Sequence, residues 1–225
     1  MNPSSKNELQ PVKEFDYQLL DTGGFKKLEQ FGPYTFVRPA PQVIWPPKLS
    51  KADWGKAHGE FRHHKKKSTG GGEWTFHKSI PKNGWPLRFR DLIFNVHTTL
   101  YGHLGLFPEQ AQNWDWISNQ INDLNGNKPN VLNMFGYTGA STLVAAARGA
   151  NVTHLDASKT SVTWARKNLE SSGLGDCPVR WIVDDAEKFL EREHRRNRKY
   201  DAIIMDPPSF GRGPKGETWN IETKM

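Results

Sequence analysis

The sequence predicts an α/β fold in which parallel strands alternate with helices. In the second half of the chain, short apolar runs end at glycine, aspartate or proline, and the first three are followed by segments with helical periodicity. Alternation of this kind is typical of βαβ units, which form a parallel sheet. The expected strands are Val131–Phe135, Val152–Leu155, Val179–Val183 and Ala202–Met205, and the expected helices are Ser141–Arg148, Lys159–Ser172 and Glu187–Arg195.

A two-glycine turn follows the first of these strands and reads Phe135-Gly136-Tyr137-Thr138-Gly139. Twenty positions after Gly136, the second strand ends at Asp156, and Ala157 and Ser158 follow it. These three residues are expected to bind the cofactor. A glycine turn at a helix start, with an acid at the end of the next strand, suits a cofactor that carries a ribose. Taken alone, the turn also fits a strand–helix connection that binds no ligand.

The side chain of Thr138 argues against a dinucleotide cofactor. A dinucleotide fingerprint has three glycines, and the second lets the backbone touch the pyrophosphate. Thr138 stands at that place in the turn. S-adenosylmethionine has no phosphates and fits better, because its carboxylate can lie at the positive helix N-terminus while its ribose hydroxyls reach Asp156.

An acidic Pro-Pro motif ends the fourth strand and reads Asp206-Pro207-Pro208-Ser209-Phe210. Proline cannot continue a central strand, so the chain is expected to leave the sheet as a stiff, extended arm. Ligands of open α/β sheets bind outside the carboxyl ends of the strands. We therefore expect Asp206 to face a second substrate and Phe210 to stack on a base. An ordinary Pro-Pro loop is the alternative.

Two acids, Asp184 and Asp185, end the third strand and precede Ala186 at a helix start. One carboxylate is expected to accept a hydrogen bond from the adenine amino group, with Ala186 against the ring. The other reading is a helix N-cap, for which aspartate is a preferred residue. Both can hold, because two carboxylates are present, and we favour Asp185 as the adenine contact.

Together these motifs resemble class I S-adenosylmethionine-dependent methyltransferases, and more narrowly the bacterial group that includes 23S rRNA methyltransferases. The turn Phe135–Gly139 resembles the F-x-Y-T-G turn of that group, and Asp206–Phe210 resembles its D-P-P-x-F motif. The segment Gly105–Gln110 is similar to the G-x-F-x-x-Q stretch that leads into the domain. The resemblance covers roughly Gly102 to Trp219.

The resemblance implies in-line transfer of the sulfonium methyl group to an RNA base. The protein is expected to bind the cofactor and the base, to align them and to exclude water. Gly136, Thr138 and Gly139 shape the turn around the methionine part, and Phe135 and Tyr137 line the pocket. Asp206, with the backbone of Pro207, is expected to orient the acceptor; Pro208 and Phe210 complete the expected catalytic set.

Cys177, the single cysteine of the chain, argues against transfer to a base carbon. Cytosine-C5 enzymes attack the base with a cysteine thiolate. Cys177 precedes the third strand, on a connection where it cannot serve this role. Transfer to a nitrogen needs no covalent step and is the easier chemistry for these residues.

The resemblance also implies a sheet of seven strands, of which the sequence supplies the first four. The chain ends 19 residues after Asp206, so the last three strands are expected to be missing. The fourth strand should then be a hydrophobic open edge, which favours association.

Three regions are expected along the chain. Residues 1–14 are polar and expected to be disordered, residues 15–107 to form a small antiparallel β domain, and residues 108–225 to form the methyltransferase domain, incomplete at its C-terminus. A helix is expected from Asn113 to Ile121. The strand-like pieces of the β domain are Tyr17–Leu20, Phe25–Phe31, Tyr34–Pro39, Glu73–His77, Leu87–Phe89, Leu92–Thr98 and His103–Phe107.

The net charge of +7 is concentrated in two basic clusters, Arg62–Lys67 and Arg192–Lys199. Such clusters can follow a phosphate backbone, although solvated loops or helix ends are the alternative. His63 and His64 have no cysteine or carboxylate set beside them, so no metal site is expected. Most of the tryptophans are expected in the core.

The remaining composition suits a cytoplasmic protein. The chain contains one cysteine, which fits a reducing compartment, and it has no apolar run of membrane-spanning length and no signal-peptide core. The sequence does not indicate an oligomeric state. Three other functions stay open: methyl transfer to a small molecule or protein, a nicotinamide oxidoreductase, and an inactive RNA-binding fragment.

Overall fold

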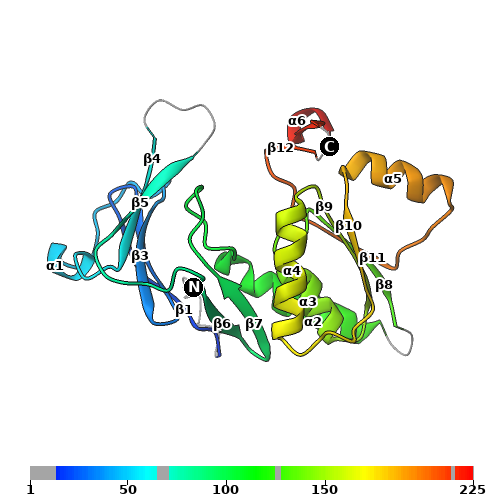
Figure 1. The fold of residues 1–225 in the computed structure, drawn as a ribbon, viewed down its shortest axis with the longest axis horizontal. Helices are drawn as coiled ribbons and strands as arrows, with labels where there is room; N and C mark the ends of the chain where they lie inside the picture. Colours follow the sequence, from blue (N-terminus) through cyan, green and yellow to red (C-terminus); the bar gives the residue numbers. More distant parts are fainter. Residues whose placement is uncertain (1–13, 65–70, 125–127, 214–215, 225) are drawn as a thin grey trace, which may run out of the picture. The chain divides into compact units, whose positions relative to one another are not determined.

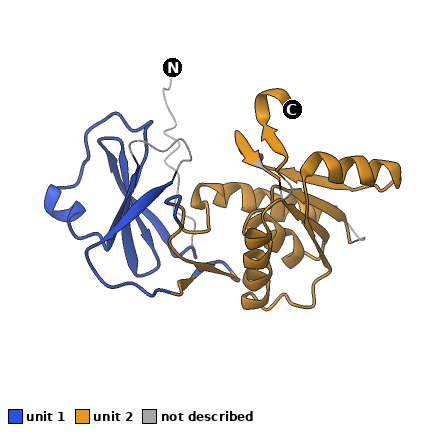
Figure 2. Ribbon diagram, turned by 45° about the horizontal axis from the view of Figure 1, so that its top comes forward, with its two compact units in different colours: residues 1–82, 87–90, 100–102 blue, residues 83–86, 91–99, 103–225 orange. Residues whose placement is uncertain are grey.

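The computed structural model describes residues 14–64, 71–124, 128–213 and 216–224. The chain divides into two compact units, which Figure 2 shows in blue and orange. The first comprises residues 1–82, 87–90 and 100–102, and the second comprises residues 83–86, 91–99 and 103–225. Apart from Glu14, the segment expected to be disordered lies outside the described residues.

The first unit contains a five-stranded sheet in the order β1-β2-β3-β4-β5. The phenylalanines Phe31, Phe36 and Phe61 are fully buried beneath it. Its elements are β1 (Tyr17–Gly23), β2 (Lys26–Phe31), β3 (Tyr34–Pro39), α1 (Lys51–Trp54), β4 (Gly59–His63) and β5 (Gly72–Phe76).

One strand pair of this sheet differs from the antiparallel arrangement expected for the region. β3 and β4 pair in parallel, with Phe36 opposite Gly59, while the other pairs are antiparallel. A parallel pair needs a long crossover connection. Residues 40–58, which include α1, provide it and bring the chain back in the same direction.

The second unit contains a four-stranded parallel sheet in the order β10-β9-β8-β11, which confirms the expected α/β fold. Figure 1 shows α2, α3 and α4 on one side of this sheet and α5 on the other. The strands are β8 (Asn130–Met134), β9 (Asn151–Asp156), β10 (Val179–Val183) and β11 (Ala202–Met205). The helices are α2 (Ala111–Asp123), α3 (Ala140–Ala147), α4 (Lys159–Ser171) and α5 (Ala186–Arg195).

Alternate residues of β8 face the two helical layers. Leu132 and Met134 pack in one buried cluster with Phe189 of α5. Asn133 points to the opposite side and donates a hydrogen bond to Thr142 Oγ1 of α3 at 2.8 Å. A strand with both faces covered needs buried side chains throughout, and four of the five residues of β8 are buried.

Among the described residues, β11 is the outer strand of the sheet and pairs with β8 alone. Its residues Ile203 and Met205 are 61% and 43% exposed. The register places them beside Leu132 and Met134, on the face that carries α5. The fourth strand therefore has the apolar open edge that the sequence predicts.

The segment between the two sheets differs from the single boundary expected after residue 107. It begins with the pair β6 (Trp85–Phe89) and β7 (Leu92–Val96), and residues 91–99 already belong to the second unit. Asn168 Oδ1 of α4 accepts a hydrogen bond from the Asn95 backbone at 2.8 Å. Ser172 Oγ accepts another from the Ile93 backbone at 2.9 Å, so side chains at the end of α4 bind β7.

One expected strand is not formed. His103–Phe107 is not a strand, because the backbone turns at Gly105, where φ is 88°. Among the tryptophans of α2, Trp114 is buried, whereas Trp116 is 62% exposed. No helix in the described part of the chain combines the length and apolar character that a membrane span requires.

Candidate functional site

The two-glycine turn leaves the tip of β8 in a strained backbone conformation. Phe135 and Tyr137 have φ values of 55° and 48°, and Gly139 has a φ of 89°. Left-handed φ values are uncommon for non-glycine residues, cost about 1–3 kcal/mol each, and persist only where the surroundings enforce them. A Cβ atom at Gly136 would lie 2.5 Å from the ring of His154, so this position also needs glycine.

Asp156 joins this turn to the end of β9. Its Oδ2 accepts a hydrogen bond from the Tyr137 backbone N–H at 2.8 Å, and its Oδ1 accepts one from Ser158 N–H at 2.8 Å. Burial raises the pKa of Asp156, and the two backbone hydrogen bonds oppose that rise. A carboxylate has about four acceptor positions, so both oxygens retain capacity for hydroxyl donors.

A buried polar chain lies below the turn. Thr142 Oγ1 accepts from Asn133 Nδ2 at 2.8 Å and lies 2.8 Å from His154 Nδ1. Burial and the charge of Arg166 lower the pKa of His154 to about 3, so the ring is neutral. Its Nε2 is buried without a hydrogen-bond partner among the described residues. These hydrogen-bonded side chains connect β8, α3 and β9 beneath the expected cofactor position.

At the tip of β10, the two acids have separate structural tasks. Asp185 is buried and caps α5, because its Oδ1 accepts from the Lys188 N–H at 3.1 Å. Asp184 pairs with Arg192 and accepts from the Asp185 N–H at 2.9 Å. Asp185 therefore satisfies the capping reading, and its contact with adenine stays a prediction. Ala186 lies in the buried cluster against which Phe135 packs.

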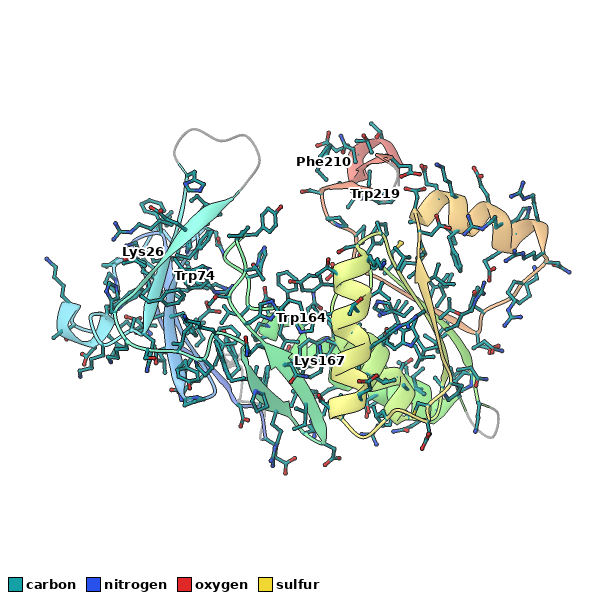
Figure 3. The ribbon with its side chains drawn as sticks, viewed as in Figure 1. Lys26, Trp74, Trp164, Lys167, Phe210 and Trp219 are labelled. Carbon is teal, nitrogen blue, oxygen red and sulfur yellow. The ribbon has the colours of Figure 1, made fainter. Side chains whose placement is uncertain are left out.

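After β11, the arm Asp206–Phe210 leads into a hairpin of β12 (Phe210–Arg212) and β13 (Thr218–Asn220), which precedes α6 (Ile221–Lys224). Figure 3 shows Phe210 and Trp219 on this hairpin. Phe210 is 57% exposed. Trp219 is buried, and its ring centroid lies 4.7 Å from that of Phe135.

A cavity of about 60 Å³ lies between the turn and the arm. It brings together five of the residues expected at the site: Phe135, Gly136, Tyr137, Thr138 and Asp206. The other expected residues do not line it, although Asp156 is bonded to the turn. They are Gly139, Asp156, Ala157, Ser158, Asp185, Ala186, Pro207, Pro208 and Phe210.

The segment before α2 forms a wall of this cavity that sequence reasoning did not assign. Leu106, Phe107 and Gln110 line it, and Gln110 belongs to the short helix Pro108–Gln110. Thr138 Oγ1 donates to the carbonyl of Gly105 at 2.5 Å, which binds this segment to the turn. The G-x-F-x-x-Q stretch was the signal for these residues, whereas no motif indicated Trp219.

Cys177 lies at the amino end of β10, at the opposite end of the sheet's strands from the candidate site. It precedes Val179, the first residue of β10, and its Sγ lies 3.8 Å from the carbonyl of Ala146. The turn, Asp156 and Asp206 all lie at the carboxyl ends of their strands. The thiol is therefore not available at the candidate site.

The basic clusters are partly neutralised where the structure describes them. Arg62 pairs with Glu60 at 2.7 Å, while Lys65, Lys66 and Lys67 lie outside the described residues. In the second cluster, Arg196 pairs with Glu193 at 3.3 Å. The described residues contain no group of three or more His, Cys, Asp or Glu side chains placed to hold a metal ion.

The chain is similar to several known proteins. The family model "Conserved hypothetical protein 95" matches residues 110–214. The ribosomal RNA large subunit methyltransferase K/L of Pseudoalteromonas atlantica is 33% identical over 131 residues, which is 57% of this chain and 17% of that protein. The ribosomal RNA large subunit methyltransferase K of Neisseria meningitidis is 36% identical over 85 residues, which is 37% of this chain and 24% of that protein.

A solved structure extends the likeness to most of the chain. The SAM-dependent methyltransferase from Agrobacterium tumefaciens is 43% identical, with a TM-score of 0.86. The match covers 92% of this chain and 64% of that chain. This chain thus spans under a quarter of the two curated relatives and less than two thirds of the solved structure. The expected resemblance is confirmed: in sequence and fold, this chain is similar to S-adenosylmethionine-dependent methyltransferases.

Proposed function

We propose that this chain carries the methyl-donor site of an S-adenosylmethionine-dependent methyltransferase whose acceptor is a base of ribosomal RNA. The observation that carries the proposal is the position of Asp156. Its carboxylate binds the glycine turn of β8 from the end of β9, at the edge where open α/β sheets bind ligands. Asp206 lies across a cavity from that turn.

The proposed roles follow the positions of the residues. The methionine part of the cofactor lies along Gly136–Gly139 at the N-terminus of α3, where the helix dipole favours its carboxylate. Asp156, with Ala157 and Ser158, holds the ribose. Asp185, Ala186 and Phe135 surround the adenine.

On the acceptor side, Asp206 receives a hydrogen bond or a proton from the base, and Pro207, Pro208 and Phe210 form the surface against which the base lies. The sulfonium makes the methyl group reactive, so these residues contribute by alignment and by exclusion of water. Cys177 lies at the amino end of β10, whereas Asp206 lies at the carboxyl end of β11. Because transfer to a base carbon would need a cysteine nucleophile near Asp206, we favour a nitrogen acceptor.

Ribosomal RNA as the acceptor is supported by the names of the two curated relatives. The net charge of +7 agrees with a polyanionic substrate. Work on ribosomal RNA would place the protein in the cytoplasm, where its single cysteine would stay reduced.

Two measurements test the proposal. Calorimetry should detect binding of S-adenosylmethionine and not of NAD. Preferential binding of NAD would support a nicotinamide oxidoreductase instead. Tritiated-methyl transfer onto ribosomal RNA, with nucleoside analysis of the product, should label a base nitrogen. Label on a protein or small molecule in a cell extract, with none on RNA, would reject the RNA acceptor. RNA binding without any transfer would identify an inactive RNA-binding fragment.

A further inference from the structure

The arm Asp206–Phe210 is held by two side chains from outside it. Gln110 Nε2, at the start of α2, donates to Asp206 Oδ2 at 3.1 Å. Trp219 Nε1, on β13, donates to the carbonyl of Pro208 at 2.8 Å. We propose that Gln110 and Trp219 are positioning residues that fix the arm in the orientation required for methyl transfer. The proposal rests on the methyltransferase function proposed above.

The composition of the arm explains why side chains must hold it. Proline has no backbone N–H, so Pro207 and Pro208 cannot donate to a neighbouring strand. β11 ends at Met205, and the next strand begins at Phe210. The pyrrolidine rings fix φ but leave the direction of the arm relative to the sheet unset. A hydrogen bond at Asp206 and another at Pro208 supply that direction.

Gln110 is itself oriented by a neighbour. Its Oε1 accepts from Asn113 Nδ2 at 2.5 Å, which turns its Nε2 toward Asp206. Gln110 lines the cavity, and the same segment binds the turn through Gly105 and Thr138. Gln110 thus connects the segment Gly105–Gln110, which contacts the glycine turn, with the carboxylate of Asp206, which would orient the acceptor.

Trp219 connects the arm with the tip of β8 from the other side. It is 8% exposed and its ring packs on Phe135, which lines the cavity. The hairpin is secured to α5 by the ion pair between Glu217 and Lys188 at 2.5 Å. Ile221 N–H also donates to the carbonyl of Ser209 at 3.1 Å. The indole therefore joins the arm and the turn within one packed group.

Hydrogen exchange measured by mass spectrometry tests the positioning without any need for activity. Gln110→Met removes the donor to Asp206 together with the acceptor for Asn113, and Trp219→Phe removes the donor to Pro208. Both changes keep much of the side-chain volume. Peptides that span residues 205–211 should exchange faster in both variants, while peptides of the turn at residues 135–142 should keep their rate. Gln112→Met and Trp116→Phe, at exposed positions of α2, are the matched controls. Unchanged exchange of the arm in both variants would overturn the inference.

Steady-state kinetics separate positioning from a purely structural role. Each variant should lower kcat about 10-fold, while KM for S-adenosylmethionine changes less than about 2-fold. In an Asp206→Ala background, which has no side-chain acceptor for Gln110, Gln110→Met should change kcat less than about 2-fold, because the bond it removes serves Asp206. Equal loss of cofactor affinity and kcat would mean that the residues only support the fold. No transfer by the unaltered chain would contradict the proposed function instead, and the exchange rates would still decide the positioning.

Discussion

At the scale of single residues, Asp156 shows how one side chain organises the site. The sequence predicts a ribose contact, and the structure adds that both carboxylate oxygens already hold backbone N–H groups, those of Tyr137 and Ser158. The same carboxylate therefore shapes the turn and presents acceptor capacity to a ligand. Its substitution must affect both tasks.

We expect Asp156→Asn to weaken S-adenosylmethionine binding at least about 10-fold, because an amide replaces one acceptor oxygen by a donor. Isothermal titration calorimetry measures the affinity, and thermal melting reports the accompanying loss of turn stability. Asp176→Asn, in an exposed loop, is the control. Wild-type affinity in Asp156→Asn would remove Asp156 from the cofactor site.

His154 predicts a pH dependence of stability. Its folded pKa is lowered from 6.5 to about 3, so between these values the unfolded chain binds the proton more readily. Its contribution is complete above pH 6.5 and is lost as the pH falls, by about 1.4 kcal/mol per pH unit. Urea unfolding at pH 7 and pH 5 should show this loss, and His154→Gln should reduce it. The exposed His194→Gln variant should retain the full dependence.

At the scale of elements, a buried ion pair connects β2 and β3 in the first unit. Arg38 Nε donates to Glu29 Oε2 at 2.7 Å, and Arg38 Nη1 donates to the carbonyl of Gly102 at 3.0 Å. Burial would raise the pKa of Glu29, but the hydrogen bonds and charges of Arg38 and Lys27 outweigh it and lower the pKa. Neither strand pattern in the sequence predicted this pair.

We expect Arg38→Met to destabilise the first unit by about 3–5 kcal/mol, because it leaves the Glu29 charge buried without its main partner. Arg62→Met removes the exposed pair with Glu60 and should leave stability unchanged. Denaturant unfolding followed by tryptophan fluorescence compares the two variants. If the two variants had the same free energy of unfolding, the buried Glu29–Arg38 pair would contribute no more to stability than the exposed pair of Arg62 and Glu60.

At the scale of the whole molecule, β11 is an apolar outer strand of the parallel sheet as far as the structure describes the chain. Exposed apolar edges favour association between copies. We expect this chain to associate with increasing concentration in sedimentation velocity, and Ile203→Lys to reduce the association. A monodisperse monomer at every concentration would contradict the expectation. Ile44→Lys, at an exposed position outside the strands, is the control.

Much of the second unit could be predicted because its signals are local. The apolar runs, the glycine turn and the strand-end acids each occupy a few successive residues, and the strand bounds agree with the structure within one residue. The first unit was harder. Its β4 has no clear flanking signal, and its parallel partner β3 lies beyond a long connection.

The sequence by itself determined the order of strands and helices in the parallel sheet, the turn, the acid at the end of β9 and the Asp-Pro-Pro arm, because these depend on neighbouring residues. The tertiary structure decided which distant side chains complete the site. Gln110 reaches Asp206 across 96 positions, and Trp219 packs on Phe135 although no motif joins them. Such contacts arise only when the packing of the sheet and its helices brings the segments together, so no local pattern encodes them.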